Sequence, residues 1–106
     1  MKSAIILFLV GILVIVGAAL GLPQKSVSEL GREAYAKQKC ALCHSISGIG
    51  GKKMALDGLG SKLKREDIKK WIRTPKEMNP DTIMKAYPNL PAKDLNNLTS
   101  YLMTLR

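Results

Sequence analysis

The stretch Cys40-Ala41-Leu42-Cys43-His44 decides how the rest of this sequence is interpreted. Two thiols stand three positions apart, close enough to share one turn of backbone, and the only histidine of the chain follows directly. Two thioether bonds to the vinyl groups of a haem, with one imidazole bond to its iron, need this spacing. Cys-x-x-Cys-His is the attachment signature of c-type haem. The motif therefore predicts one haem c, held covalently through Cys40 and Cys43.

Other uses of the two cysteines have less support in the sequence. A structural zinc site takes four ligands, and two cysteines with a single histidine leave one position unfilled. A dithiol redox pair of the thioredoxin type belongs to a βαβ framework, which the helical pattern described below does not provide. A dithiol redox pair or a simple disulfide remains the alternative to the favoured haem interpretation.

Length, charge and composition limit the class of protein. The chain has 106 residues, which fits one small domain, and a net charge of +9. The basic residues lie mostly outside the apolar N-terminal segment, so the folded domain is expected to bind acidic partners. Nucleic acid is disfavoured as a partner, because aromatic residues make up only 5% of the chain and no nucleic-acid-binding motif is present.

The N-terminal segment carries no charge from residue 4 to residue 22. As a helix at ~1.5 Å per residue it reaches about 29 Å, close to the ~30 Å hydrocarbon thickness of a membrane. We therefore predict a membrane anchor or uncleaved signal-like helix over residues 1–23, followed by a domain over residues 24–106. Ala19 and Gly21 also fit a signal-peptidase site, so a cleaved signal is the alternative.

The domain itself is predicted to be all-α with long loops. Ser26 and Glu29 have the spacing of a capping box, which predicts a helix that continues to about Lys39. A short helix is expected over residues 64–73, where acidic residues come early and a proline follows. No alternating strand pattern is present.

Glycine and proline mark the irregular segments. Residues 45–63 hold many of the glycines and are predicted to form a loop, and residues 75–91 hold most of the prolines and are predicted to be irregular. Pro91 suits the first position of a terminal helix. One face of that helix is marked by Leu95, Leu98, Leu102 and Leu105.

From residue 27 to residue 106 the sequence resembles the small monohaem class I cytochromes c. The pieces that match, besides the haem motif, are Gly31, Tyr35, Trp71-Ile72, Pro75, the segment Asn79-Pro80-Asp81-Thr82-Ile83-Met84, and Tyr101-Leu102. The resemblance implies a cytochrome c fold, with three to five helices wrapped around a covalent haem. It also implies that the terminal helices cross, with Gly31 and Tyr101 at the contact.

The resemblance further implies His44 and a methionine as the two axial ligands of the iron. Met84 stands at the position that matches the family's ligand, about forty residues after His44 and three before Tyr87. Two alternatives stay open: Met78 or Met54 as the ligand, or an iron with no sixth protein ligand. Any of these methionines can instead fill a gap in a core.

The chain departs from the family pattern at two places. Lys85 follows Met84, where the family commonly has proline. The Gly-Pro pair that often follows the haem motif, and whose neighbouring carbonyl accepts the histidine N–H, is absent; Met54-Ala55 stands nearby. A carbonyl partner for His44 is therefore expected without being assigned.

Two aromatic residues complete the predicted haem-binding set. The resemblance implies that the Trp71 N–H bonds a haem propionate, with a plain core position as the equal alternative. Tyr87 is included because it follows the predicted ligand Met84 closely.

Histidine and methionine ligation fills both axial positions, which favours electron transfer over catalysis. We predict a one-electron carrier between larger acidic redox proteins, with no enzymatic activity and no small-molecule substrate. Lys52, Lys53 and Lys85 are predicted to surround the haem edge, although each alone is also compatible with a solvated surface. The alternatives are a haem subunit fixed in a larger oxidoreductase complex, and a small-ligand sensor or weak peroxidase if Met84 is labile.

Haem attachment to Cys-x-x-Cys-His takes place outside the cytoplasm in this family. The resemblance therefore implies a single-pass protein of the bacterial cytoplasmic membrane, with the haem domain on the periplasmic or outer face. Positive charges after the apolar segment favour the opposite orientation by the positive-inside rule, and the haem chemistry outweighs them. A soluble periplasmic protein is expected if the signal is cleaved.

Overall fold

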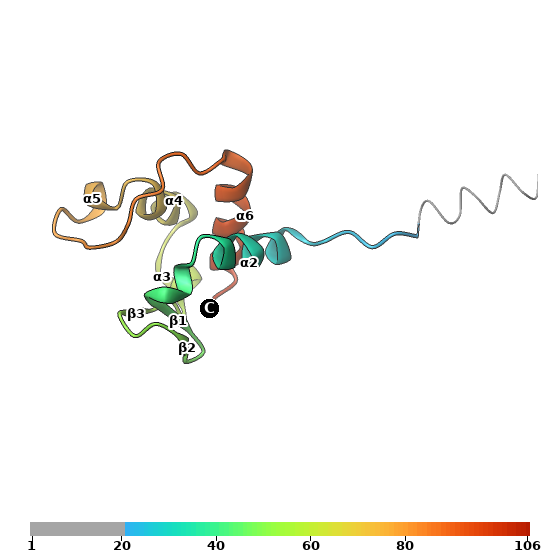
Figure 1. Ribbon diagram of the computed structural model, residues 1–106, viewed down its shortest axis with the longest axis horizontal. Coiled ribbons are helices and arrows are strands. Elements are labelled where there is room, and N and C mark those ends of the chain that lie inside the picture. Colours follow the sequence, from blue (N-terminus) through green and yellow to red (C-terminus); the bar gives the residue numbers. More distant parts are fainter. Residues whose placement is uncertain (1–20) are drawn as a thin grey trace, which may run out of the picture.

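The structure is a computed structural model that describes residues 21–106. Five α-helices and one small sheet make up this part of the chain (Figure 1). The helices are α2 (Val27–Lys37), α3 (Leu59–Lys62), α4 (Arg65–Arg73), α5 (Pro75–Met78) and α6 (Ala92–Met103). A single 3-10 turn, η1 (Cys40–Leu42), and the strands β1 (His44–Ile46), β2 (Ile49–Gly50) and β3 (Met54–Ala55) lie between α2 and α3.

The predicted capping box at the start of α2 is confirmed. The Ser26 hydroxyl accepts a hydrogen bond from the Glu29 N–H at 3.1 Å, and the Glu29 carboxylate accepts one from the Ser26 N–H at 3.2 Å. The helix ends at Lys37, two residues earlier than predicted. Lys39 then adopts a left-handed conformation with φ 58°, and this sharp corner leads the chain into η1.

Helices α2 and α6 cross in direct backbone contact (Figure 1). A Cβ atom at Gly31 would overlap the Asn97 carbonyl oxygen and the Tyr101 Cβ, so only glycine permits this approach. The rings of Tyr35 and Tyr101 meet edge to face beside the crossing, with centroids 5.9 Å apart. The expectation that the terminal helices cross at Gly31 and Tyr101 is confirmed.

The core lies against the inner face of α6. Leu95, Leu98 and Leu102 are buried, as predicted, whereas Leu105 lies beyond the end of the helix and is half-buried. The other core residues lie on α2, α3, α4 and α6 and on two connecting segments. They are Ala34, Tyr35, Leu56, Leu59, Ile68, Ile72, Leu90 and Tyr101.

The prediction that residues 45–63 form only a loop is wrong, whereas the predicted helical domain agrees with the five helices of residues 21–106. Three short strands lie in the order β2-β1-β3, with β1 antiparallel to β2 and parallel to β3. Ser47 and Gly48 both have positive φ, which suits a two-residue hairpin turn, and the Asp57 carboxylate accepts a 2.7 Å hydrogen bond from the Ser47 N–H. Strands of two or three residues are too short to produce an alternating pattern. The domain nevertheless remains mainly helical.

Helix α4 agrees with its prediction, but the next segment is less irregular than expected. Pro75 occupies the first turn of the short helix α5, where its missing N–H costs no helical hydrogen bond. Residues 79–91 contain no helix or strand. In the glycine-rich segment, α3 was also missed, and a Cβ at Gly60 would overlap the Met103 carbonyl at the end of α6.

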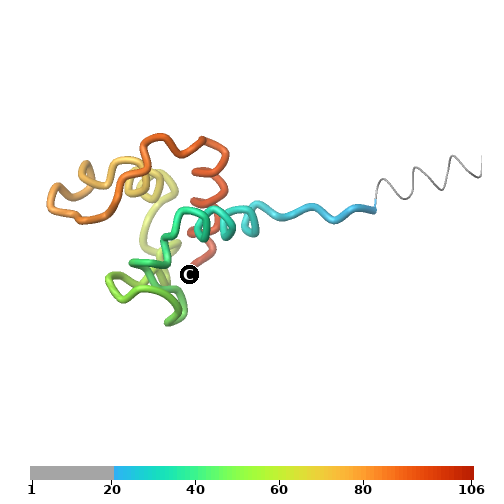
Figure 2. Tube along the Cα trace, viewed as in Figure 1, coloured from blue at the N-terminus to red at the C-terminus, as the bar shows by residue number. Residues whose placement is uncertain are grey.

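The predicted membrane anchor falls outside the described residues, apart from the last two positions of its apolar segment. Residues 21–26 leave the domain as non-helical chain (Figure 2), and Leu22 is exposed. Within residues 21–106, no helix is both long enough and apolar enough to cross a membrane.

Candidate haem-binding site

The two cysteines lie at the corner between α2 and the sheet. η1 holds Cys40, and the Cys43 N–H closes the turn by donating to the Cys40 carbonyl at 3.2 Å. Cys40 is half-buried and packs against the core, whereas Cys43 is exposed, and no disulfide joins the two. Burial raises the pKa of the Cys40 thiol above its ordinary value. The Cys40 side chain therefore lies against the core, and the Cys43 side chain lies at the surface.

His44 is oriented by a backbone carbonyl of the neighbouring strand. The His44 Nδ1 lies 3.2 Å from the Met54 carbonyl oxygen, and His44 is paired with Met54 in the register of β1 and β3. With Nδ1–H as the donor, Nε2 keeps the lone pair that a metal ligand needs. The carbonyl that the sequence could not assign is therefore that of Met54.

Backbone contacts hold the sheet against the cysteine turn. The Gly51 N–H donates to the Ala41 carbonyl at 2.8 Å, and the Cys43 carbonyl accepts from the Lys53 N–H at 3.0 Å. A Cβ at Gly51 would overlap the Leu42 carbonyl and lie 2.7 Å from the Cys43 Cα. The absence of a side chain at Gly51 thus permits the close contact that fixes the attachment segment.

Met84 lies on the segment 79–91, which follows α5. In Figure 1 this segment lies together with α4 and α5, and the sheet lies below them in the view. Met84 is half-buried, and its N–H donates to the Thr82 hydroxyl at 3.2 Å. Of the alternative ligands, Met78 is half-buried and Met54 is 54% exposed.

Tyr87 joins the Met84 segment to two other parts of the domain. Its hydroxyl donates to the Gln38 carbonyl at 3.2 Å, and its backbone N–H donates to the Ile72 carbonyl at 2.9 Å. Burial raises the pKa of Tyr87 above its ordinary value. The Lys85 ammonium group lies over the Tyr87 ring, 5.3 Å from its centroid.

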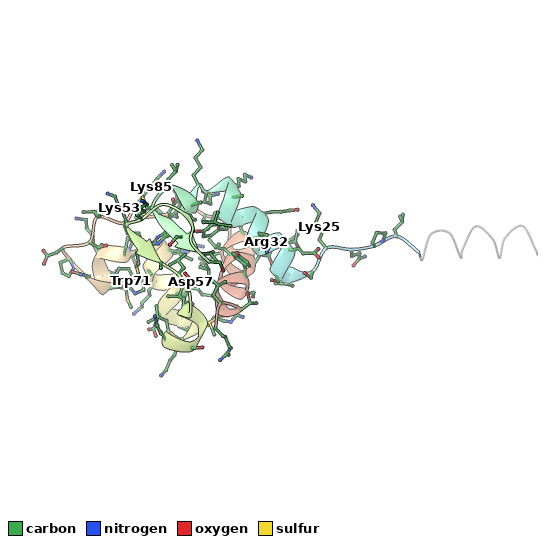
Figure 3. The ribbon with its side chains drawn as sticks, turned by 90° about the horizontal axis from the view of Figure 1, so that it is seen from below. Lys25, Arg32, Lys53, Asp57, Trp71 and Lys85 are labelled. Carbon is green, nitrogen blue, oxygen red and sulfur yellow. The ribbon has the colours of Figure 1, made fainter. Side chains whose placement is uncertain are left out.

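Trp71, of the predicted haem-binding set, and Tyr35, of the family resemblance, differ in burial. Trp71 is half-buried on α4, outside the cluster of buried side chains, and is labelled in Figure 3. Its contact with a haem propionate stays a prediction. Tyr35 is buried, and its hydroxyl has no hydrogen-bond partner among residues 21–106. Burial raises the pKa of Tyr35 to about 12.

The cationic residues of the prediction lie on the surface. Lys52, Lys53 and Lys85 are exposed. Figure 3 shows Lys53 and Lys85 at the end of the molecule that lies away from Lys25.

The residues of the attachment segment fit a covalently bound haem. Cys40 reaches the edge of the apolar core, Cys43 is accessible, and the His44 ring is fixed through Nδ1 with Nε2 available. Two thiols and one oriented imidazole on a short turn are the donor set that this group requires.

Comparison with known proteins agrees with this chemistry. A family model described as Cytochrome c matches residues 28–106. The chain belongs to the cytochrome c family. This cytochrome c carries haem c bound covalently through Cys40 and Cys43, and its chemistry is haem-based electron transfer. The predicted resemblance to class I monohaem cytochromes c is confirmed.

One relative is a considerably longer protein. Cytochrome c oxidase subunit 2 of Alkalihalophilus pseudofirmus is 26% identical over 94 residues, which cover 79% of this chain and 27% of the relative. The chain thus spans about a quarter of the length of that protein.

Sequence reasoning missed several contacts of the site. The Gly50-Gly51 pair soon after the haem motif was a usable signal, because adjacent glycines often mark a close backbone approach. The Met54 carbonyl and the Gln38 carbonyl carried no signal, since every residue has a carbonyl and only the fold selects one.

Substitution of Gly51 tests the contact between the sheet and the cysteine turn. We expect Gly51→Ala to reduce the free energy of unfolding of the haem-loaded protein by about 1–3 kcal/mol, because the added methyl group meets backbone atoms that cannot rotate away. Urea denaturation followed by circular dichroism measures the change.

Gly48→Asn in the same hairpin is the matched control. A Cβ there meets nothing within 4 Å, and asparagine tolerates the positive φ of 77° better than most residues. Equal destabilisation by both substitutions would show that the close contact at Gly51 is not what holds the turn.

Proposed function

We propose that this cytochrome c is a one-electron carrier whose haem iron is bound by His44 and Met84. The observation that carries the proposal is the hydrogen bond between His44 Nδ1 and the Met54 carbonyl. This bond fixes the ring plane and makes Nε2 a better ligand. When bound, the haem supplies a one-electron iron couple, and a methionine ligand beside the histidine would raise its potential.

The Met84 thioether is proposed as the second ligand because of its position and burial. Met84 is half-buried in a segment that Tyr87 ties to the end of α2, close to Cys40. If His44 and Met84 both hold the iron, the protein would leave it no position for a substrate, which supports electron transfer over catalysis. Trp71 and Tyr87 are proposed as further haem contacts.

Lys53 and Lys85 support an acidic redox protein as the partner. The Lys53 backbone N–H bonds the Cys43 carbonyl, and Lys85 directly follows Met84, so each lysine adjoins one of the two ligand-bearing segments. Their ammonium groups would attract an approaching acidic surface and increase the rate of encounter.

The proposed location is the outer, periplasmic face of the bacterial cytoplasmic membrane, with residues 4–22 as a single-pass anchor. The support is the uncharged length of that segment and the extracytoplasmic attachment of haem in this family. A soluble periplasmic carrier follows instead if the segment is removed as a signal.

Two other functions remain as candidates. The similarity to an oxidase subunit 2 favours a haem subunit fixed in a larger oxidase complex. A small-ligand sensor or weak peroxidase would follow if Met84 leaves the iron readily, since a vacated axial position can bind a small molecule.

Substitution of Met84 tests the ligand assignment and the sensor alternative together. We expect Met84→Ala to lower the reduction potential, to abolish the absorption band typical of methionine bound to ferric haem, and to allow rapid binding of carbon monoxide to the reduced protein. Redox titration and stopped-flow spectroscopy measure these changes.

Met54→Ala is the control, because it removes an exposed side chain and keeps the carbonyl that His44 uses. It should retain the band and the slow carbon monoxide reaction. Rapid, complete binding of carbon monoxide to the unmodified protein would contradict the carrier function and favour the sensor.

The surface around Lys53 and Lys85 is the proposed docking surface. Its charge can be probed with ferricyanide, an anionic one-electron oxidant. We expect Lys53→Glu and Lys85→Glu each to slow oxidation about 3- to 10-fold at low ionic strength, with the difference shrinking as salt is added. Stopped-flow measurements over a range of salt concentrations provide the rates.

Lys93→Glu on α6 changes the net charge by the same amount at a different exposed position. It should slow the reaction much less. If Lys93→Glu has as large an effect as the other two, the rate depends on total charge and no local surface steers the oxidant.

The location is tested on protein from the native membrane and from the soluble extracellular fraction. We expect a haem-staining band in washed membranes whose intact mass includes residues 1–23 and one haem. A haem band in the soluble fraction that lacks the first ~20 residues would instead support a cleaved signal.

The native size after detergent extraction separates a mobile carrier from a fixed subunit. A monomeric size is expected for the carrier. Co-elution with stoichiometric partner proteins would favour the oxidase-subunit alternative.

A further inference from the structure

The side-chain hydroxyl of Tyr87 forms a link between two distant parts of the chain. It donates to the carbonyl of Gln38, the C-cap residue of α2, at 3.2 Å. Carbonyl groups at the end of a helix have no partner inside the helix, so Tyr87 satisfies one of them. Gln38 stands two residues before Cys40, at the corner that leads into the attachment segment.

The backbone of Tyr87 is fixed by α4. Its N–H donates to the Ile72 carbonyl at 2.9 Å, and the Arg73 guanidinium donates to the Pro88 carbonyl at 2.9 Å. Arg73 also reaches the Tyr87 carbonyl at 3.5 Å. The ring is therefore supported by α4 while its hydroxyl reaches across to the end of α2.

Few other bonds restrain the segment that holds Met84. Residues 79–91 contain no helix or strand, and the Met84 N–H is bonded only to nearby Thr82. Among residues 21–106, the bond from Tyr87 to Gln38 is the one hydrogen bond that joins residues 79–91 to residues 37–46. A segment of this kind loses much conformational freedom when its methionine is held at one point.

We propose that the Tyr87 hydroxyl is a positioning group for Met84, which holds the methionine segment in register with the segment that carries Cys40 and His44. This inference rests on the proposed function, in which Met84 is an axial ligand. The thioether is a neutral, weak ligand, so its binding depends on how closely the segment is held near the iron. Loss of the hydroxyl releases one tie and shifts the segment towards conformations in which Met84 is detached.

Tyr87→Phe tests the proposal, because it keeps the ring, the backbone bonds and the contact with Lys85. The probe is imidazole, which binds ferric haem only when the methionine has left. We expect Tyr87→Phe to increase the apparent affinity for imidazole about 3- to 10-fold, the range that one hydrogen bond accounts for. The methionine-to-iron absorption band should also disappear at a lower temperature, well below the temperature of unfolding.

Tyr35→Phe is the matched control. Tyr35 also adjoins the Cys40 region and is more deeply buried, but its hydroxyl has no hydrogen-bond partner in the described part of the chain. Its removal should leave the imidazole affinity and the absorption band unchanged. A general effect of removing a buried hydroxyl would alter both variants.

An imidazole affinity of Tyr87→Phe equal to that of the unmodified protein would overturn the positioning role. An equal increase in Tyr35→Phe would also overturn it. Failure of the underlying ligand assignment gives a different result: Met84→Ala would then bind imidazole no better than the unmodified protein, and the positioning role would fall with the assignment.

Discussion

The contact of α2 with α6 at Gly31 determines where the other parts of this cytochrome c lie. Because no Cβ separates the two backbones, α2 and α6 have one fixed crossing point, and Tyr35 and Tyr101 pack beside it. The direction of α2 then sets the position of the corner at Lys39, from which the cysteine turn begins. The far end of α6 meets α3 at another position where a side chain would not fit, Gly60. The position of the haem-binding segment thus depends on the helix contacts at Gly31 and Gly60, which lie outside that segment.

The two proposed axial ligands are held in different ways. His44 belongs to a strand with hydrogen-bonded neighbours on both edges, and its ring is bonded to the Met54 carbonyl. Met84 lies in a segment without regular structure, where Tyr87 provides the bond to the cysteine side. Regular pairing resists local opening more than an irregular segment does. The segment that holds His44 is therefore the part of the proposed iron site that resists local opening. Release of Met84 would determine how readily a small ligand binds the iron.

Much of this arrangement could be predicted because its signals are local. Ser26 and Glu29 indicate the start of a helix within a stretch of four residues. The haem motif indicates covalent haem attachment within a stretch of five residues. The sheet could not be predicted, because its strands are too short to show a pattern and depend on the Gly51 contact with the cysteine turn. The bond from Tyr87 to Gln38 joins residues 49 positions apart, and the acceptor is a backbone atom with no sequence signature. Tertiary packing alone selects such a partner.

The separation of contacts along the chain has a consequence for the order of assembly. The cysteine turn and the sheet are close neighbours in sequence, so their mutual contacts close short loops at little entropic cost. Helix α6 is the last element and joins α2 across almost the whole domain, which makes its docking slow by comparison. This order of closure would place both thiols on a formed turn before α6 covers the core. Cys40, which is half-buried in the finished domain, would then be most accessible to covalent modification before α6 docks.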